Sequence, residues 1–153
     1  MSGYVWCVWL HVLAATVWVG SMVFFAVAVV PALRRREVRD VAPALMTILG
    51  ARFRVVGTVS LLVLLVTGAL ELGYHGIGWS DLMHGTLWSS DFGRTLAHKL
   101  ALVAVVVAAT VVHEFITRRD ALQHRRAASW IGRVMMVASL GILYFAVRLA
   151  RGL

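Results

Sequence analysis

Residues 8 to 25, VWLHVLAATVWVGSMVFF, form an almost wholly apolar run with one ionisable side chain, His11. An ionisable group inside a membrane-spanning segment is costly and is by default a candidate functional residue. A neutral imidazole can donate a hydrogen bond, accept one or bind a metal, depending on which ring nitrogen carries the proton. His11 is therefore the first candidate for chemistry in this chain.

A second histidine is predicted at the depth of His11. His11 lies about seven residues, or roughly 10 Å, into its predicted helix, and His98 lies about five residues into another. Two imidazoles at matched depth can face each other across a helical bundle. Haem iron takes one axial ligand from each side of the porphyrin, so the pair predicts a bis-histidine haem b. His75 and His84, in the loop on the same side, could each replace one ligand.

The helical neighbours of His11 allow two interpretations. At spacings of three, four and seven they are Cys7, Ala14, Ala15 and Trp18. Small alanines leave room for a flat macrocycle, and Trp18 could pack against its edge. The alternative is that small residues simply permit close helix packing, with His11 as a hydrogen-bonded packing residue.

Two basic residues flank His98. Lys99 could extend its amine to the membrane surface, pair with Glu71, or contact a bound anion such as a haem propionate. Arg94, one turn earlier, could contact a propionate in the same way.

Copper is the competing cofactor. Cys7 and His11 are four residues apart and share a helical face, while Met83 and His84 lie in the outer loop. Sulfur and imidazole ligands suit Cu(I). Against this, the methionines are scattered, and methionine in an apolar helix usually serves packing.

The elements that must position these residues are predicted to be membrane helices. A span needs about 20 mostly apolar residues, and four stretches qualify: about 4–33, 53–73, 93–117 and 130–150. Residues 34–52, together with Phe53, contain a possible additional short helix, VAPALMTILGARF. With 61% hydrophobic and 14% charged residues, the composition does not suit a soluble domain. The sequence predicts one all-α domain over 1–153, a polytopic membrane protein built as a four-transmembrane-helix up-down bundle.

Charge predicts the orientation of this bundle. The net charge is +8, which in a soluble protein would suggest nucleic acid but here indicates basic loops at a membrane surface. Eleven arginines flank the first and third connections, against four basic residues on the other side. Basic loops stay in the cytoplasm, so both termini are predicted outside the bacterial inner membrane. The N-terminal run is too long for a signal peptide and is expected to be retained.

Other chemistries lack support in the sequence. A single cysteine excludes an internal disulfide and a cysteine-based zinc motif. The glycines match neither a phosphate-binding loop nor a dinucleotide fingerprint, and no hydrolase triad is evident.

Three segments resemble the copper-resistance protein D (CopD) family of bacterial membrane proteins: LHVLAATVWVGSMVFF, RFRVVGTVSLLVLLVTGALEL and FGRTLAHKLALVAVVVAA. The third is also similar to HemJ-type protoporphyrinogen oxidases, haem b membrane proteins with a four-helix core. In that family a first-helix histidine and a third-helix lysine match His11 and Lys99. His98 departs from the family pattern, and the chain lacks the extra spans of copper importers.

The expected function is that of a membrane b-type haem protein, with His11 and His98 as ligands. Its role would be electron transfer between a membrane quinone and an outer-side partner, or redox sensing. A protoporphyrinogen-oxidase-like activity is the enzymatic form of this hypothesis. A copper-handling protein and a structural protein without a cofactor are the alternatives. The lipid-facing surfaces are also compatible with a homodimer.

Overall fold

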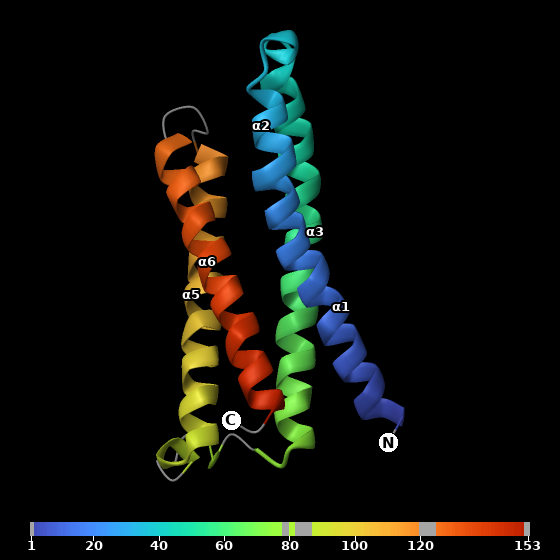
Figure 1. Cartoon of the computed structure of the whole chain (residues 1–153), viewed down its shortest axis with the longest axis vertical. Helices are drawn as coiled ribbons and strands as arrows, with labels where there is room; N and C mark the ends of the chain where they lie inside the picture. Colours follow the sequence, from blue (N-terminus) through green and yellow to red (C-terminus); the bar gives the residue numbers. More distant parts are fainter. Residues whose placement is uncertain (1, 78–79, 82–86, 120–124, 152–153) are drawn as a thin grey trace. The chain divides into compact units, whose positions relative to one another are not determined.

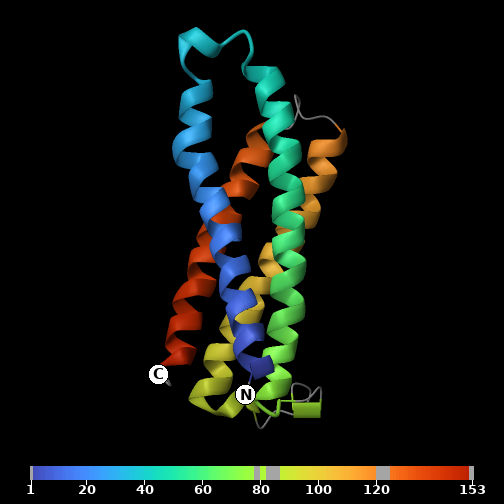
Figure 2. The same ribbon diagram turned by 90° about the vertical axis from the view of Figure 1, so that its right-hand side faces the viewer.

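The computed structural model describes residues 2–77, 80–81, 87–119 and 125–151, and within these ranges every regular element is a helix. The chain divides into two compact units, Met1–Gly78 and Trp79–Leu153. Each unit is a hairpin of two long antiparallel helices (Figures 1 and 2). The predicted all-α class is therefore confirmed.

The first unit begins with one long helical stretch over Gly3–Leu33. It comprises α1 (Ser2–Phe24), the π-helical turn η1 (Phe25–Val29) and α2 (Val30–Leu33). In η1 the Val30 N–H bonds to the Phe25 carbonyl, one residue beyond the α-helical partner. Pro31 follows directly and lies in the first turn of α2, where its missing N–H is tolerated.

The return helix of this unit is longer than predicted. After a 3-10 turn, η2 (Arg36–Val38), α3 runs without interruption over Ala42–Tyr74. The predicted short helix and the second predicted span are thus parts of one helix, which begins at Ala42 rather than near Phe53. Pro43 lies in the first turn of α3, where proline is favoured. Gly50 costs only about 1 kcal/mol in a helix interior, which is too little to end this one.

A seam of small residues joins α1 to α3. The buried residues of the seam are Cys7, Ala14 and Trp18 on α1, and Ser60 and Thr67 on α3. They recur at intervals of four and seven, which place side chains on one helical face. Gly57 makes room for the large Trp18 ring, because a Cβ there would lie 3.3 Å from Cζ3 of that ring. Small residues let two membrane helices approach closely, and this seam fixes the register of the hairpin.

The second unit pairs α5 (Asp91–Arg119) with α6 (Arg125–Ala150), preceded by a 3-10 turn, η3 (Leu87–Ser89). Ser90 caps α5, since its Oγ accepts the Gly93 N–H at 3.0 Å. Asp91 adds a negative charge to the first turn, where the helix dipole favours it. Among the described residues of this hairpin, the buried ones are Gly93, Thr95, Leu96, Val106, Met135, Ala138 and Ser139.

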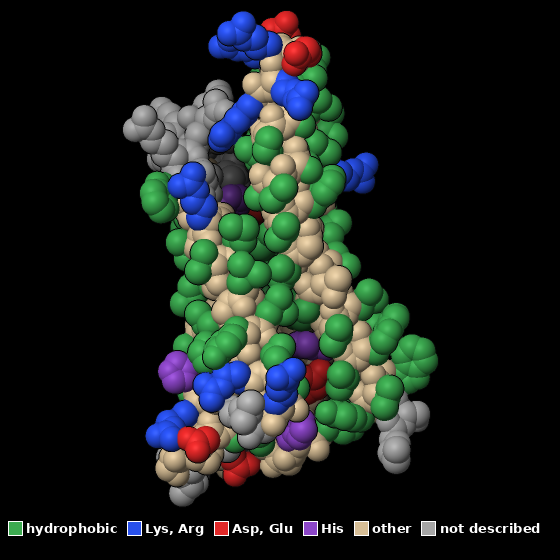
Figure 3. Space-filling model, in the orientation of Figure 1, with side chains coloured by type: hydrophobic (Ala, Val, Ile, Leu, Met, Phe, Trp, Pro, Cys, Tyr) green, Lys and Arg blue, Asp and Glu red, His purple; other side chains and the backbone are tan. Residues whose placement is uncertain are grey.

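Within the described residues, four helices are long and apolar enough to cross a membrane: Gly3–Leu33, Ala42–Tyr74, Asp91–Ile116 and Trp130–Ala150. Large apolar side chains are exposed along the length of these helices. On the face drawn in Figure 3, most charged side chains lie toward the ends of the helices. Such a surface suits a lipid environment. The protein is therefore a multi-pass membrane protein, while the side on which its termini lie stays a prediction.

The close packing of α1 on α3 can be tested by substitution at Gly57. Replacing Gly57 by leucine is expected to destabilise the α1–α3 hairpin by about 1–3 kcal/mol, because the new side chain must displace Trp18. Gly50→Leu is the matched control on the same helix, since nothing lies within 4 Å of its added Cβ. Both substitutions change helix propensity equally. Thermal unfolding in detergent, followed by circular dichroism, compares the two variants, and equal stability would show that the seam tolerates bulk.

Candidate functional site

His11 lies on α1 and its ring hydrogen-bonds to α3. Its Nδ1 is 2.7 Å from Thr67 Oγ1. The Thr67 hydroxyl already donates its proton to the Val63 carbonyl, at 2.6 Å. Since a hydroxyl has only one proton to donate, Thr67 must accept a hydrogen bond from His11 Nδ1–H. The neutral imidazole is thereby fixed in the tautomer whose lone pair is on Nε2.

Glu71 lies one turn beyond Thr67 and faces the same ring. Its Oε1 is 3.9 Å from His11 Nδ1, beyond hydrogen-bond length but close enough for a charge interaction. The side chains of His11 and Glu71 are only 20% and 21% exposed. Glu71 Oε1 itself is buried and has no hydrogen-bond partner among the described residues. The carboxylate therefore acts on the imidazole electrostatically.

Two smaller residues complete the surroundings of His11. Gly68 lies under the ring, where a Cβ would stand 3.5 Å from Cε1. The Cys7 thiol is buried and donates to the Thr67 carbonyl at 3.5 Å. We refer to Cys7, His11, Thr67 and Glu71 as the His11 cluster. The cluster is polar and lies within two spanning helices. On α3, the Thr67 hydroxyl accepts the hydrogen bond of the ring and Glu71 adds a nearby carboxylate.

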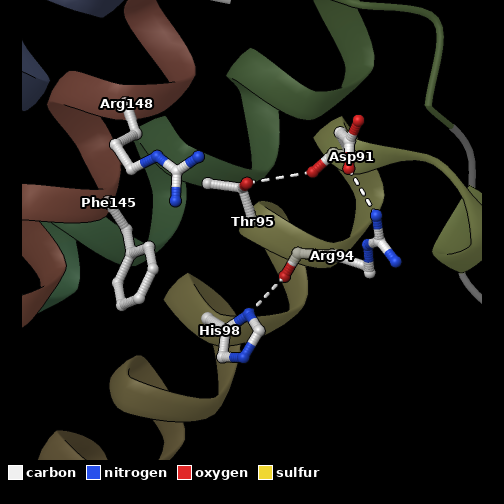
Figure 4. A pocket seen from close by; sticks show the side chains of 6 residues that line it. All are labelled: Asp91, Arg94, Thr95, His98, Phe145 and Arg148. Carbon is white, nitrogen blue, oxygen red and sulfur yellow. Dashed lines mark hydrogen bonds and ion pairs between the residues drawn. The ribbon is translucent and has the colours of Figure 1, made fainter. Parts of the chain in front are cut away.

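His98 has the same tautomer on α5. Its Nδ1 is 2.6 Å from the Arg94 backbone carbonyl (Figure 4). A carbonyl oxygen can only accept, so Nδ1 carries the proton and Nε2 the lone pair. The ring stacks on Phe145 of α6, with 5.4 Å between centroids and 13° between planes. A local hydrogen bond and an aromatic neighbour therefore fix its orientation.

A hollow of about 340 Å³ lies beside His98 at the end of the α5–α6 hairpin (Figure 4). Arg94 forms an ion pair with Asp91 at its edge, and both side chains are largely exposed. The buried Thr95 donates its hydroxyl proton to the Asp91 carbonyl at 2.9 Å. Arg148 reaches the hollow from the last turn of α6. The residues that line it are Asp91, Arg94, Thr95, His98, Phe145 and Arg148.

The remaining predicted site residues have varied surroundings. His75 caps the C-terminus of α3, where its backbone N–H bonds to the carbonyls of Glu71 and Leu72. Its exposed ring meets Tyr4 edge-on at 6.0 Å. Trp18 fills the α1–α3 seam against Gly57. Lys99 is half-buried on α5.

Several predicted pairings stay predictions. His11 and His98 belong to separate units, so a shared haem between them rests on the sequence argument. The same holds for Lys99 with Glu71, and for Trp18 against a macrocycle. Met83 and His84, named for the copper alternative, lie outside the described residues. Among the described residues no group of three or more His, Cys, Asp or Glu side chains could hold a bare metal ion.

Sequence reasoning missed two residues: Thr67 of the His11 cluster and Arg148, which lines the hollow beside His98. Thr67 had a readable signal, because it lies four residues before Glu71 and so shares its helical face. Its contact with His11 spans 56 residues of sequence, and one sequence does not reveal the register of two helices. Arg148 was counted only as charge, although its spacing of three from Phe145 puts both on one face of α6.

Comparison with known proteins identifies relatives without assigning an activity. The family model described as "Domain of unknown function (DUF4149)" matches residues 13–129. An uncharacterized protein of Aquifex aeolicus (strain VF5) is 32% identical over 148 residues, which cover 94% of this chain and 92% of the relative. No solved structure matches the chain. Because the family model spans most of the chain, this protein belongs to the DUF4149 family.

Proposed function

We propose that this protein is a b-type haem protein of the bacterial inner membrane, with His11 and His98 as axial ligands. One observation carries the proposal. Both rings donate Nδ1–H to an oxygen acceptor, and so both place the lone pair on Nε2. Histidines that ligate metals almost always donate their other ring N–H in this way, to a carboxylate, a carbonyl or water.

Of the two proposed haem ligands, His11 is better supported than His98 because of the His11 cluster around it. Thr67 fixes the tautomer, and the nearby Glu71 carboxylate increases the electron-donating power of the ring. Such a polar group within a membrane span is costly and calls for a function. A pure packing role would require only one hydrogen bond for the ring, and it leaves the buried Glu71 oxygen unexplained.

The side chains of this protein would hold the cofactor in place and neutralise its negative charges. His11 and His98 would hold it through Nε2, and Arg94 or Lys99 would neutralise its propionates. When bound, haem b supplies one-electron transfer, and its axial ligands help to set the potential. The basic loops predict that this chemistry lies at the outer face of the membrane, within reach of a quinone and an outer-side partner.

Cofactor content tests the proposal against the copper alternative. The protein is purified in detergent from cells supplied with iron, copper and a haem precursor, and both metals are measured by elemental analysis. The proposal predicts iron in proportion to protein and protohaem in the solvent extract. Copper without haem would support the copper alternative. A protein that contains neither copper nor haem would support the alternative of a structural protein without a cofactor.

Thr67→Val tests whether the tautomer of His11 matters. Valine keeps the shape of threonine but offers no acceptor to Nδ1–H. Loss of an outer-shell partner typically costs about 10–100-fold in metal affinity, and we expect haem affinity to fall by that factor. Titration of haem-free protein with haemin measures it. Thr67→Ser keeps the hydroxyl and should bind like the wild type, whereas equal affinity of the valine variant would remove Thr67 from the site.

A further inference from the structure

We propose that the hollow at the end of the α5–α6 hairpin binds a phosphate group. The geometry brings two guanidinium groups, Arg94 and Arg148, to one cavity that holds a single carboxylate, Asp91. Asp91 is engaged by Arg94. Arg148 makes no close ion pair with the described residues of its hairpin, although its charge also acts on Asp91. Two guanidinium groups thus share one carboxylate, and the lining of the hollow carries a net positive charge.

The chemistry of the lining fits a phosphate oxyanion. A guanidinium presents parallel N–H donors that match two phosphate oxygens, and it recognises phosphate better than a carboxyl or hydroxyl lining could. The His98 ring also lines the hollow, with its Nδ1–H held by the Arg94 carbonyl. Its Nε2 is the proposed ligand of the haem iron, so the phosphate is assigned to the guanidinium groups alone. Phe145, stacked on this ring, adds an apolar wall.

The position of the hollow indicates where such a phosphate would come from. Asp91 begins one candidate span and Ala150 ends another, so Arg94 and Arg148 lie near the boundary of the hydrocarbon layer. Lipid phosphates lie at this depth, and basic pockets between membrane helices bind anionic head groups. A cavity of about 340 Å³ is within the usual size of ligand sites. The two sources of this chemistry are a phospholipid head group and free inorganic phosphate.

The test compares two arginines at the same end of α6. Wild type, Arg148→Gln and Arg151→Gln are purified in mild detergent, and bound phosphorus per chain is measured after a fixed wash. Arg151 is exposed and does not line the hollow, so it is the matched control. Hydrogen bonds to charged groups account for about a tenfold change in affinity or more, so Arg148→Gln should retain about tenfold less phosphorus. Arg151→Gln should retain as much as the wild type.

Two further measurements identify the source of the bound phosphate. Delipidated protein is exposed to phosphatidylcholine vesicles with or without phosphatidylglycerol, and separately to inorganic phosphate followed by phosphorus NMR. Selective retention of phosphatidylglycerol assigns the hollow to a lipid head group, and binding of inorganic phosphate alone assigns it to free phosphate. Arg148→Lys keeps the charge and should recover part of the binding, which covers the case in which Arg148→Gln fails to fold.

Three results would overturn the proposal. The first is equal phosphorus in wild type and Arg148→Gln. The second is wild-type protein that binds neither phosphatidylglycerol nor inorganic phosphate. The third is an Arg148→Gln variant that loses haem but keeps its phosphorus, because the hollow would then serve propionates. The phosphorus measurement does not depend on haem, so this proposal can fail or hold independently of the proposed function.

Discussion

Replacing His11 by alanine is expected to remove haem from the purified protein. The substitution takes away the axial ligand together with the ring that Thr67 and Glu71 hold in place. Outer-shell partners alone are worth about 10–100-fold in affinity, so loss of the ligand itself should exceed that range. The Soret absorbance per chain should therefore fall to a small fraction of the wild-type value. Absorption spectra of both proteins at equal concentration measure the effect.

Two controls separate ligation from a structural role. His11→Gly with added imidazole should regain haem absorbance, because free imidazole can occupy the space of the side chain. A residue that only packs would give no such rescue. His113 lies on α5 as well, near the opposite end of that helix from His98, and serves as the control: His113→Ala should keep the wild-type spectrum. An unchanged spectrum in His11→Ala would show that His11 is not a ligand.

Replacing His98 by alanine is expected to change the coordination of the iron more than the amount of haem. His11 would remain as a ligand, still supported by Thr67, while the other axial position would be lost. A five-coordinate, high-spin haem should result, with broad visible bands in place of sharp α and β bands. Spectra of the reduced variant and electron paramagnetic resonance of the oxidised variant detect the change in spin state.

A replacement ligand provides the check for this second prediction. His98→Met offers a thioether at the same position and should restore a six-coordinate spectrum with a raised midpoint potential. If His98→Ala leaves the bands sharp while His75→Ala or His84→Ala broadens them, the second ligand is that residue and not His98. The α5 assignment would then be wrong, and the His11 assignment would stand.

The helices could largely be predicted from the sequence, because runs of apolar residues of sufficient length have few alternatives in a membrane. The exception is instructive. Hydropathy predicts the second span from about Phe53, yet the helix that contains it begins at Ala42. The possible short helix before that span is the first part of α3, because arginine forms helices well and one glycine costs little. Hydropathy locates the part of a helix inside the membrane and not the ends that extend beyond it.

The candidate site could be predicted only in part, because its partners lie far apart in sequence. His11 stood out as an ionisable residue in an apolar run, and this required no knowledge of the fold. Its acceptor Thr67 depends on how α1 packs on α3, which is set by the fit of Trp18 to Gly57. The His98 hydrogen bond to Arg94 is local, at a spacing of four residues, yet nothing in the sequence alone indicates the tautomer of the ring.

The most direct test of the central proposal is the absorption spectrum of the purified wild-type protein, recorded oxidised and after reduction with dithionite. The haem should be low-spin and six-coordinate, because two imidazoles with their lone pairs on Nε2 are assigned to the iron. The proposal predicts a Soret band that sharpens on reduction, together with narrow α and β bands. A colourless protein, even when it is produced with an added haem precursor, would contradict it.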